Sequence, residues 1–247
     1  QLGYGPSSPM KACNQMISVT EALLGRHSTR AFLDRPVAAD LVRDIIDVAR
    51  RAPSSSNMQP WRLAAMAGDD LARLKAAVRQ SLTVQPMGEG SEYKIYADHL
   101  KEPYNGHRRK CAEDMYGSIG IPRENKLGRL MQFARNFDFF GAPVGMILLV
   151  DRSMEPGQWA DLGIFLQSLL LLAQERGLAT CPQAAWAAMH KTVRAHLGLP
   201  DELMVYCGIS LGYADPAHPI NGLVTDRAPF AEVAELRGFA VAAVEPA

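Results

Sequence analysis

The most constraining feature of the sequence is a long apolar segment in its second half. Residues 156–177 read PGQWADLGIFLQSLLLLAQERG, which predicts a helix that begins at a proline and ends at a glycine. Apolar side chains occupy nearly every face of this helix, so it must be buried on more than one side. Its most apolar part, residues 162–173, is only about a dozen residues long, whereas a membrane-spanning helix needs ~20. The segment therefore predicts a core helix of a globular protein.

A sheet is expected to pack against this helix. Residues 142–150 (APVGMILLV) form a strongly apolar run, which predicts a buried strand at the centre of a sheet. Residues 38–51 predict an amphipathic helix, because apolar positions recur at helical spacing opposite charged ones. The other expected elements are strands at residues 61–67 and 203–211, an extended segment at 179–186, and helices at 18–24, 69–81 and 189–197.

Composition sets limits on location and partners. The chain has 247 residues, of which 48% are hydrophobic and 21% charged, and this is ordinary for a globular protein with a sizeable core. The 26 basic and 26 acidic residues balance, so no overall charge favours nucleic acid or a membrane surface. No secretory signal pattern is found in residues 1–15, which we expect to form a flexible arm. The cysteines lack disulfide or metal spacing, so we expect reduced thiols in a cytoplasmic protein; they are Cys13, Cys111, Cys181 and Cys207.

Two short polar segments carry the candidate chemistry. Residues 26–30 read RHSTR, and because Gly25 ends the preceding helix we expect them to form a turn. Guanidinium groups bind phosphate oxygens through paired hydrogen bonds, and the hydroxyls can add neutral donors. Residues 52–61 read APSSSNMQPW, a loop in which Asn57 and Gln59 offer amides that both donate and accept. Taken singly, the first segment is also explained as a solvated turn, and the second as a loop that ends the preceding helix.

Together, these segments resemble the motifs of the nitroreductase family, FMN-dependent flavoproteins that use NAD(P)H. In that family an Arg-x-Ser-x-Arg/Lys motif is followed, one helix later, by Pro-Ser-x-x-Asn-x-Gln-Pro-Trp. Here RHSTR, an amphipathic helix and PSSSNMQPW occur in the same order. CPQAAW at residues 181–186 and Arg227 within NGLVTDRAPF extend the resemblance. It covers residues 20–230, with a poorly matched middle.

The resemblance implies an α+β, three-layer fold with a central, mostly antiparallel sheet flanked by helices. Residues 16–230 would form a single FMN-binding domain, and residues 231–247 a C-terminal tail. It also implies an intertwined homodimer in which the long helices pack across a two-fold axis and each FMN lies at the subunit interface. A monomer with a fully internal helix at residues 156–177 is the alternative.

The resemblance also implies a set of cofactor-binding residues. The arginines would hold the FMN phosphate, and CPQAAW would run beside the isoalloxazine ring with backbone N–H groups near N5. The set comprises Arg26, His27, Ser28, Arg30, Pro53, Ser54, Ser55, Asn57, Gln59, Pro182, Gln183, Ala184, Ala185 and Arg227.

Two positions depart from the pattern of some family members. Ala184 and Ala185 stand where those members have Glu-Gly, so contacts to the ring would be made by the backbone. Thr225 stands where they have lysine, so the phosphate would depend more on the arginines. Three aromatic residues are candidate walls for a substrate, with plain core packing as the alternative; they are Trp61, Phe139 and Trp186.

Residues 82–136 are the least regular part of the chain. Helical stretches occur only near residues 108–117 and 123–135, and we expect the region to form a lid or excursion. Between residues 98 and 135 there are eight lysines and arginines and five acids, an excess of three positive charges. This excess indicates either a solvated surface or a positive rim that favours a carboxylated substrate or the phosphate of NADPH. His99, His107 and Cys111 lack the spacing of a zinc site, so no metal is expected.

The activity implied by the resemblance follows from the cofactor. FMN carries out hydride chemistry itself, so no catalytic side chain is expected. We expect hydride transfer from NAD(P)H to a nitroaromatic acceptor by a ping-pong mechanism, giving nitroso and hydroxylamine products, as in nitroarene and nitrobenzoate reductases. The alternatives are a reductase of quinones, enones or free flavin, an oxygen-dependent flavin-fragmenting enzyme, and a non-catalytic flavin-binding protein.

Overall fold

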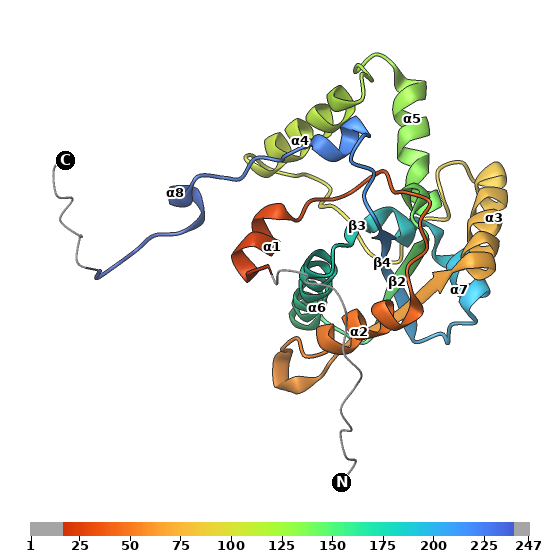
Figure 1. Ribbon diagram of the computed structural model, residues 1–247, viewed down its shortest axis with the longest axis horizontal. Coiled ribbons are helices and arrows are strands. Elements are labelled where there is room, and N and C mark those ends of the chain that lie inside the picture. Colours follow the sequence, from red (N-terminus) through yellow and green to blue (C-terminus); the bar gives the residue numbers. More distant parts are fainter. Residues whose placement is uncertain (1–16, 240–247) are drawn as a thin grey trace, which may run out of the picture.

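The structure, a computed structural model, describes residues 17–239 (Figure 1). Within these residues four antiparallel strands form one sheet in the order β1-β2-β4-β3. The strands are β1 (Trp61–Ala67), β2 (Val144–Asp151), β3 (Ala179–Gln183) and β4 (Leu203–Gly212). β2 lies in the sheet interior and is buried at seven of its eight positions. The prediction of a central strand at this apolar run is confirmed, whereas the expected arm at residues 1–15 lies outside the described residues.

Helices cover both faces of the sheet. α2 and α6 share one apolar cluster with the sheet, and α3 and α7 share the other. These clusters are the interfaces of three layers, so the predicted α+β, three-layer fold is confirmed. The helices are α1 (Val19–Gly25), α2 (Ala39–Ala49), α3 (Gly68–Val84), α4 (Tyr104–Ser118), α5 (Lys126–Ala134), α6 (Pro156–Glu175), α7 (His190–Leu197) and α8 (Phe230–Val233). Short 3-10 turns are η1 (Ser55–Asn57), η2 (Arg135–Gly141), η3 (Ala184–Met189) and η4 (Pro219–Gly222).

β2 contributes side chains to both apolar clusters, because successive side chains of a strand point to opposite faces of the sheet. Met146 and Leu148 belong to the α2/α6 cluster, whereas Ile147 and Leu149 belong to the α3/α7 cluster. Each fully buried side chain of this size contributes about 1.5–3 kcal/mol of hydrophobic free energy. The sheet therefore holds both helical layers in place.

α6 is buried along one side in the single chain. Leu162, Phe165 and Leu169 are at most 1% exposed and contact the sheet side of the molecule. On the opposite side Gly163 and Ile164 are exposed, Ile164 to 41%. The burial on several sides that the sequence predicts is therefore incomplete within one chain. No helix in residues 17–239 combines the length and apolar character needed to cross a membrane.

The segment at residues 26–30 differs from its prediction as a turn. Ser28 forms a parallel bridge with Thr180 of β3, and the Thr29 N–H donates to the Thr180 carbonyl oxygen at 2.9 Å. The segment is therefore extended along the edge of the sheet. The turn prediction is wrong because pairing with a strand far away in the sequence outweighs the local signal from Gly25.

The region at residues 85–136 leaves the sheet and carries α4 and α5, which lie at the top of Figure 1. The start of this region is held at Glu89, whose N–H donates to the Ala188 carbonyl oxygen at 2.7 Å. Farther along, Lys110 of α4 forms an ion pair of 2.7 Å with Asp226 of the C-terminal segment. Beyond this contact the segment with α8 extends away from the body (Figure 1).

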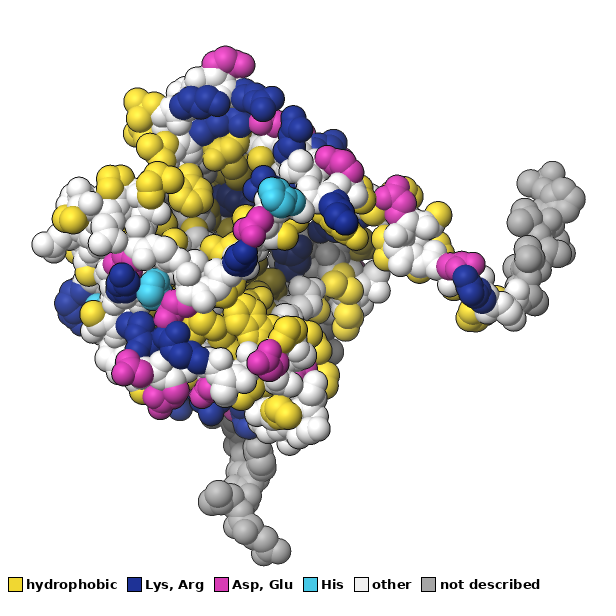
Figure 2. All heavy atoms as spheres, turned by 180° about the vertical axis from the view of Figure 1, so that it is seen from behind, with side chains coloured by type: hydrophobic (Ala, Val, Ile, Leu, Met, Phe, Trp, Pro, Cys, Tyr) yellow, Lys and Arg dark blue, Asp and Glu magenta, His cyan; other side chains and the backbone are white. Residues whose placement is uncertain are grey.

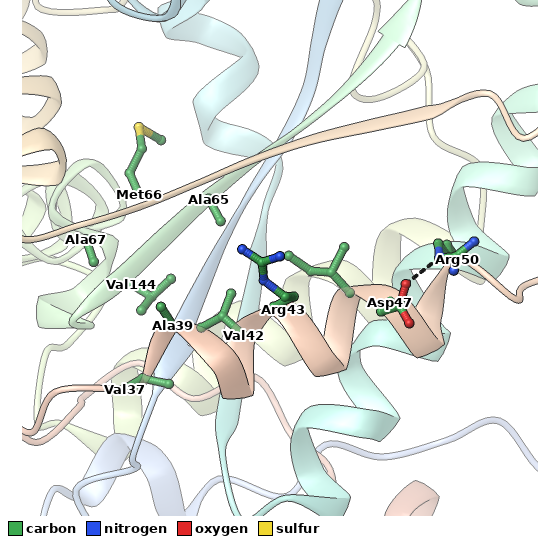
Figure 3. Close-up of a pocket in the computed structure, with 11 residues that line it drawn as sticks. Val37, Ala39, Val42, Arg43, Asp47, Arg50, Ala65, Met66, Ala67 and Val144 are labelled. Carbon is green, nitrogen blue, oxygen red and sulfur yellow. Dashed lines mark hydrogen bonds and ion pairs between the residues drawn. The ribbon is translucent and has the colours of Figure 1, made fainter. Parts of the chain in front are cut away.

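A groove of about 450 Å³ lies between α2 and β1 (Figure 3). Its floor is apolar, and its rim carries Arg43 and the ion pair of Asp47 with Arg50 at 2.7 Å. Within residues 17–239, the β1 edge beside this groove pairs with no further strand. The lining includes none of the cofactor- or substrate-binding residues predicted from the sequence, so we place the candidate site elsewhere.

Candidate functional site

The basic part of the site begins where α1 ends. A capping box starts this helix: the Ser18 N–H donates to Glu21 Oε2 at 2.6 Å, and the Glu21 N–H donates to Ser18 Oγ at 3.2 Å. The helix ends at Gly25, and Arg26 follows in extended conformation and is partly buried. Burial lowers the pKa of Arg26, and the positive charge of Arg227 lowers it further. The two guanidinium groups are therefore near enough to repel each other.

The charges of this cluster are not neutralised by acids. Within the described residues, Arg227 donates to the hydroxyl and carbonyl oxygens of Thr225 and to the Asp226 carbonyl oxygen. Across residues 17–239, no carboxylate forms an ion pair with Arg26, Arg30 or Arg227. A partly buried cation without a counter-ion is unfavourable, so an anion bound here would be stabilised.

The RHSTR side of this cluster lies beside Cys181 of β3. Burial raises the pKa of this thiol to about 11, against the opposing effects of Arg30, Ser28 and Arg26. These three residues of the RHSTR segment therefore lie around the first residue of CPQAAW. His27 contacts a neighbour in sequence instead, with Nδ1 3.3 Å from the Gly25 carbonyl oxygen. The structure thus brings two of the sequence-predicted segments together.

Asn221 is a positioning residue that the sequence does not reveal. Its Oδ1 accepts the Arg30 N–H at 2.9 Å, while its Nδ2 donates to the Ala31 carbonyl oxygen at 2.8 Å and to the Asp215 carbonyl oxygen at 2.9 Å. These bonds attach the C-terminal segment to the RHSTR segment. They fix the backbone of Arg30 beside β3.

The loop at residues 53–59 is strained and exposed. Ser56, Asn57 and Gln59 have φ angles of 48°, 57° and 51°, a left-handed conformation that side chains other than glycine rarely adopt. The loop is held by Asp161 of α6, which is 4% exposed and accepts the Ser55 N–H at 3.1 Å. The amide side chains of Asn57 and Gln59 therefore lie at the surface, on a loop anchored from below.

The two predicted cofactor segments lie near opposite ends of α6. Ser55 is bonded to Asp161, whereas Gly25 lies against Gln174, since a Cβ on this glycine would be 3.2 Å from the amide nitrogen of Gln174. Asp161 and Gln174 are thirteen positions apart in α6, which corresponds to ~20 Å at ~1.5 Å per residue. Within one chain the two segments cannot both contact the same phosphate group.

The CPQAAW segment opens on a cavity of about 400 Å³, which we call the β3 cavity. Three of its aromatic rings pack together: Tyr93 lies 4.9 Å from Trp159 and 6.0 Å from Tyr206, centroid to centroid. The Tyr93 hydroxyl donates to the Tyr206 carbonyl oxygen, and burial raises the pKa of Tyr93. The lining consists of Tyr93, Lys94, Ile95, Trp159, Leu166, Pro182, Gln183, Ala184, Tyr206 and Cys207. Sequence analysis missed the aromatic residues because they come from three separate elements.

Gln183 offers the cavity only its backbone. Its Nε2 donates to the Asn136 carbonyl oxygen at 2.9 Å, and its Oε1 accepts the Ser210 hydroxyl at 2.8 Å. Both ends of the amide are therefore used inside the protein. Pro182 has no N–H to donate, and it stands on an edge strand, where proline is tolerated.

The predicted aromatic walls are core residues. Phe139 and Trp186 are both 0% exposed and stack on each other, with centroids 4.2 Å apart. Trp61 is 8% exposed and stacks on Phe165 at 5.0 Å. None of these three predicted walls lines the β3 cavity, so the core-packing alternative describes them in this structure. Within the described residues these rings pack in the core, and their role as walls for a substrate stays a prediction.

Comparison with known proteins agrees with this geometry. The model of the nitroreductase family matches residues 23–213. A nitrobenzene nitroreductase of Ectopseudomonas oleovorans is 38% identical over 203 residues, which are 82% of this chain and 89% of that protein. A 4-nitrobenzoate reductase of Pseudomonas putida is 38% identical over 80% of this chain and 86% of its own length.

A solved structure agrees over nearly the whole chain. The FMN and NADPH-dependent nitroreductase NfnB from sphigopyxis sp. strain HMH is 42% identical and superposes with a TM-score of 0.88. The match covers 90% of this chain and 100% of that chain. Sequence motifs, three-layer fold and family model point in the same direction: the chain belongs to the nitroreductase family.

Proposed function

We propose that the protein is an FMN-dependent oxidoreductase that transfers hydride from NAD(P)H to a nitroaromatic acceptor. The observation that carries the proposal is the partly buried Arg26 beside Arg227, without an acid partner in residues 17–239 and next to the strand that lines the β3 cavity. A phosphate would neutralise the arginines, and a planar ring would fit the aromatic cavity. The relatives named for nitrobenzene and 4-nitrobenzoate reduction support the choice of acceptor.

The chain's own residues would position the cofactor. When bound, FMN supplies the hydride chemistry. Arg26, Arg30 and Arg227 would hold its phosphate, and Ser28, which lies near Cys181 of β3, would add a neutral donor. The backbone at residues 183–184 would face the ring, and the internal bonds of the Gln183 side chain would keep that backbone fixed. The aromatic side chains of the β3 cavity would exclude water from the face of the flavin ring.

We infer that the active form is a homodimer. The exposed side of α6 supports this inference, as do apolar side chains that one chain leaves open to solvent, among them Leu24 at 83% and Val224 at 87% exposure. A second chain would cover them. In a symmetric pair, the loop at residues 53–59 of one chain could approach the ring bound by the other, which would give the strained loop a ligand. We place the enzyme in the cytoplasm, as its cysteine pattern suggests.

Anaerobic rapid mixing tests the proposal directly. NADPH should bleach the flavin absorbance of the holoenzyme, and a nitroarene added afterwards should restore it. Restoration by a quinone but not by any nitroarene would identify another acceptor, and absence of bleaching would indicate a flavin-binding protein. Because both substrates would use the same cavity in turn, steady-state double-reciprocal plots should be parallel; intersecting lines would contradict a ping-pong mechanism.

A double substitution tests the phosphate site. Arg26→Ala with Arg227→Ala should lose FMN on dialysis while the far-ultraviolet circular dichroism is unchanged, because two of the three charged contacts to the phosphate are removed. Arg43→Ala with Arg50→Ala removes the same charge at the α2 groove and should keep the flavin. Full flavin retention in the first variant would show that the phosphate lies elsewhere.

A further inference from the structure

A second cavity lies beside the RHSTR segment, on the side of α4 and α5. It has a volume of about 340 Å³, within the range of small-molecule pockets, and we call it the α4 cavity. Arg30 and Arg108 contribute the charged part of its lining, and aromatic rings such as Tyr96 and Tyr116 contribute the walls. Figure 2 shows Lys and Arg side chains gathered at the top of the molecule, where α4 and α5 lie. The cavity is thus both cationic and aromatic.

The positive charge of this cavity is available to a ligand. Arg108 lies over the Tyr96 ring, 5.1 Å from its centroid, and forms no ion pair with an acid of residues 17–239. The nearby acids of α4 are already paired, Glu113 with Arg129 at 2.6 Å and Asp114 with Lys110 at 2.7 Å. They therefore do not neutralise Arg108.

A buried amide supplies an independent sign of a missing ligand. Gln132 lines the same cavity and is 8% exposed, yet its Nε2 has no hydrogen-bond partner in the described part of the chain. An amide N–H that is removed from water without an acceptor is unfavourable, so such groups are nearly always paired. The neighbouring Asn136 is not its partner, and the Asn136 carbonyl oxygen and Oδ1 accept from Gln183 instead. A ligand oxygen would pair the Gln132 amide.

The α4 cavity borders the proposed flavin site. Asn136 lines the cavity and is bonded to Gln183 of the β3 cavity, and Arg30 lines it from the segment that pairs with β3. The α4 cavity therefore shares the RHSTR segment with the proposed flavin site, and an aromatic acid in the α4 cavity would have one end beside Arg30 and Arg108. Because that end would meet two guanidinium groups and an unpaired N–H, it should carry negatively charged oxygens.

We propose that the α4 cavity binds the carboxylate of an aromatic acid, and that the acceptor substrate is a carboxylated nitroarene such as a nitrobenzoate. Arg108 supplies the charge that selects the carboxylate, Gln132 donates a hydrogen bond to it, and the aromatic walls accept the ring. This inference rests on the proposed function and specifies its substrate class. Arg108 and Gln132 act in substrate selection and contact no reacting atom.

Binding to the holoenzyme tests the cavity without turnover. Isothermal titration should give benzoate at least tenfold higher affinity than benzamide, which has the same shape and no charge. Arg108→Gln and Gln132→Leu should each reduce this preference. Arg109→Gln makes the same charge change one residue away, outside the lining, and should retain it. Equal affinities in the wild-type protein, or an equal loss in Arg109→Gln, would overturn the proposal, as would displacement of benzoate by inorganic phosphate at equal concentration.

Steady-state kinetics then relate the cavity to the reaction. The ratio of kcat/KM for 4-nitrobenzoate to kcat/KM for nitrobenzene should fall at least tenfold in Arg108→Gln, mainly through KM, and stay unchanged in Arg109→Gln. An unchanged ratio in Arg108→Gln would refute the inference while the nitroreductase activity stands. If neither nitroarene is reduced by the wild-type holoenzyme, the proposed function fails, and the benzoate titration still decides whether the cavity binds carboxylates.

Discussion

Glu89 attaches the start of the region at residues 85–136 to α7. Removing its side chain should destabilise the protein strongly. Its carboxylate accepts the Lys191 N–H at 2.8 Å and the Thr192 N–H at 3.1 Å, both in the first turn of α7, and the hydroxyls of Ser81 and Thr192. An N-terminal cap contributes about 1 kcal/mol, and hydrogen bonds to a charged group contribute about 1.5–3 kcal/mol each before shared desolvation is subtracted. For Glu89→Ala we therefore expect a loss of about 2–4 kcal/mol in the free energy of unfolding.

The pH dependence of this contribution has a definite sign. Burial alone would raise the pKa of Glu89, but the hydrogen bonds from Thr192, Ser81 and Lys191 outweigh burial, so its pKa in the folded protein lies below the ordinary 4.5. A lowered folded pKa means that the stabilisation is present in full above the unfolded pKa and is lost as the pH falls through the folded pKa. The difference between wild type and Glu89→Ala should therefore be largest near neutral pH and shrink below about pH 4.5.

Urea unfolding at one fixed chain concentration measures both quantities. Glu89→Gln keeps the shape but loses the charge, and it should retain part of the stability. Glu124→Ala is the control, because this exposed acid of the same region accepts no side-chain hydrogen bond in the described structure, and its effect should stay within about 0.5 kcal/mol. A loss below about 0.5 kcal/mol for Glu89→Ala at neutral pH, or a loss that does not change with acidification, would refute the reasoning.

Two further substitutions test the packing around the site. Gly208→Ala should lower the free energy of unfolding by about 1–3 kcal/mol or more, measured by thermal or urea unfolding, because the new Cβ would lie 2.1 Å from Cδ1 of the fully buried Trp186. Gly117→Ala is the control: its new Cβ would have no atom within 4 Å, so it should change the free energy of unfolding by less than about 1 kcal/mol. Asp161→Ala should cost about 1–3 kcal/mol and weaken flavin retention on dialysis, because the strained loop loses the acceptor of its Ser55 N–H. Wild-type retention in this variant would mean that the loop does not contact the cofactor.

Elements with a clear local period could be predicted from the sequence. The helix expected at residues 69–81 is α3, in which the structure buries Leu71, Leu74 and Val78 at helical spacing. The apolar run of β2 and the long helix α6 also lie within a few residues of their predicted bounds. Each of these patterns is complete within one segment, so no distant partner is needed to recognise it.

Long-range partners explain what the sequence did not reveal. Asp161 acts on a residue 106 positions away, and Asn221 on one 191 positions away, so no local spacing marks either residue. The RHSTR segment looked like a turn because its partner, Thr180, lies far along the chain. Within the described residues, α4 has no buried apolar face and is held by ion pairs to other segments, such as Lys110 with Asp226. Its apolar residues therefore show only a weak helical period in the sequence.

Both ends of the region at residues 85–136 attach to one short stretch of chain. Glu89 binds the first turn of α7 at its start, and Asn136 binds Gln183 at its end, so the two anchors lie within residues 183–192. That stretch begins at the segment proposed to face the flavin ring. The covering helices are therefore positioned by the same backbone that would position the cofactor, while Arg108 lies between the anchors and takes part in neither. A substitution of Arg108 can therefore change which acceptor is selected without displacing the flavin ring. For this reason we locate substrate selection in α4 and cofactor binding in the sheet.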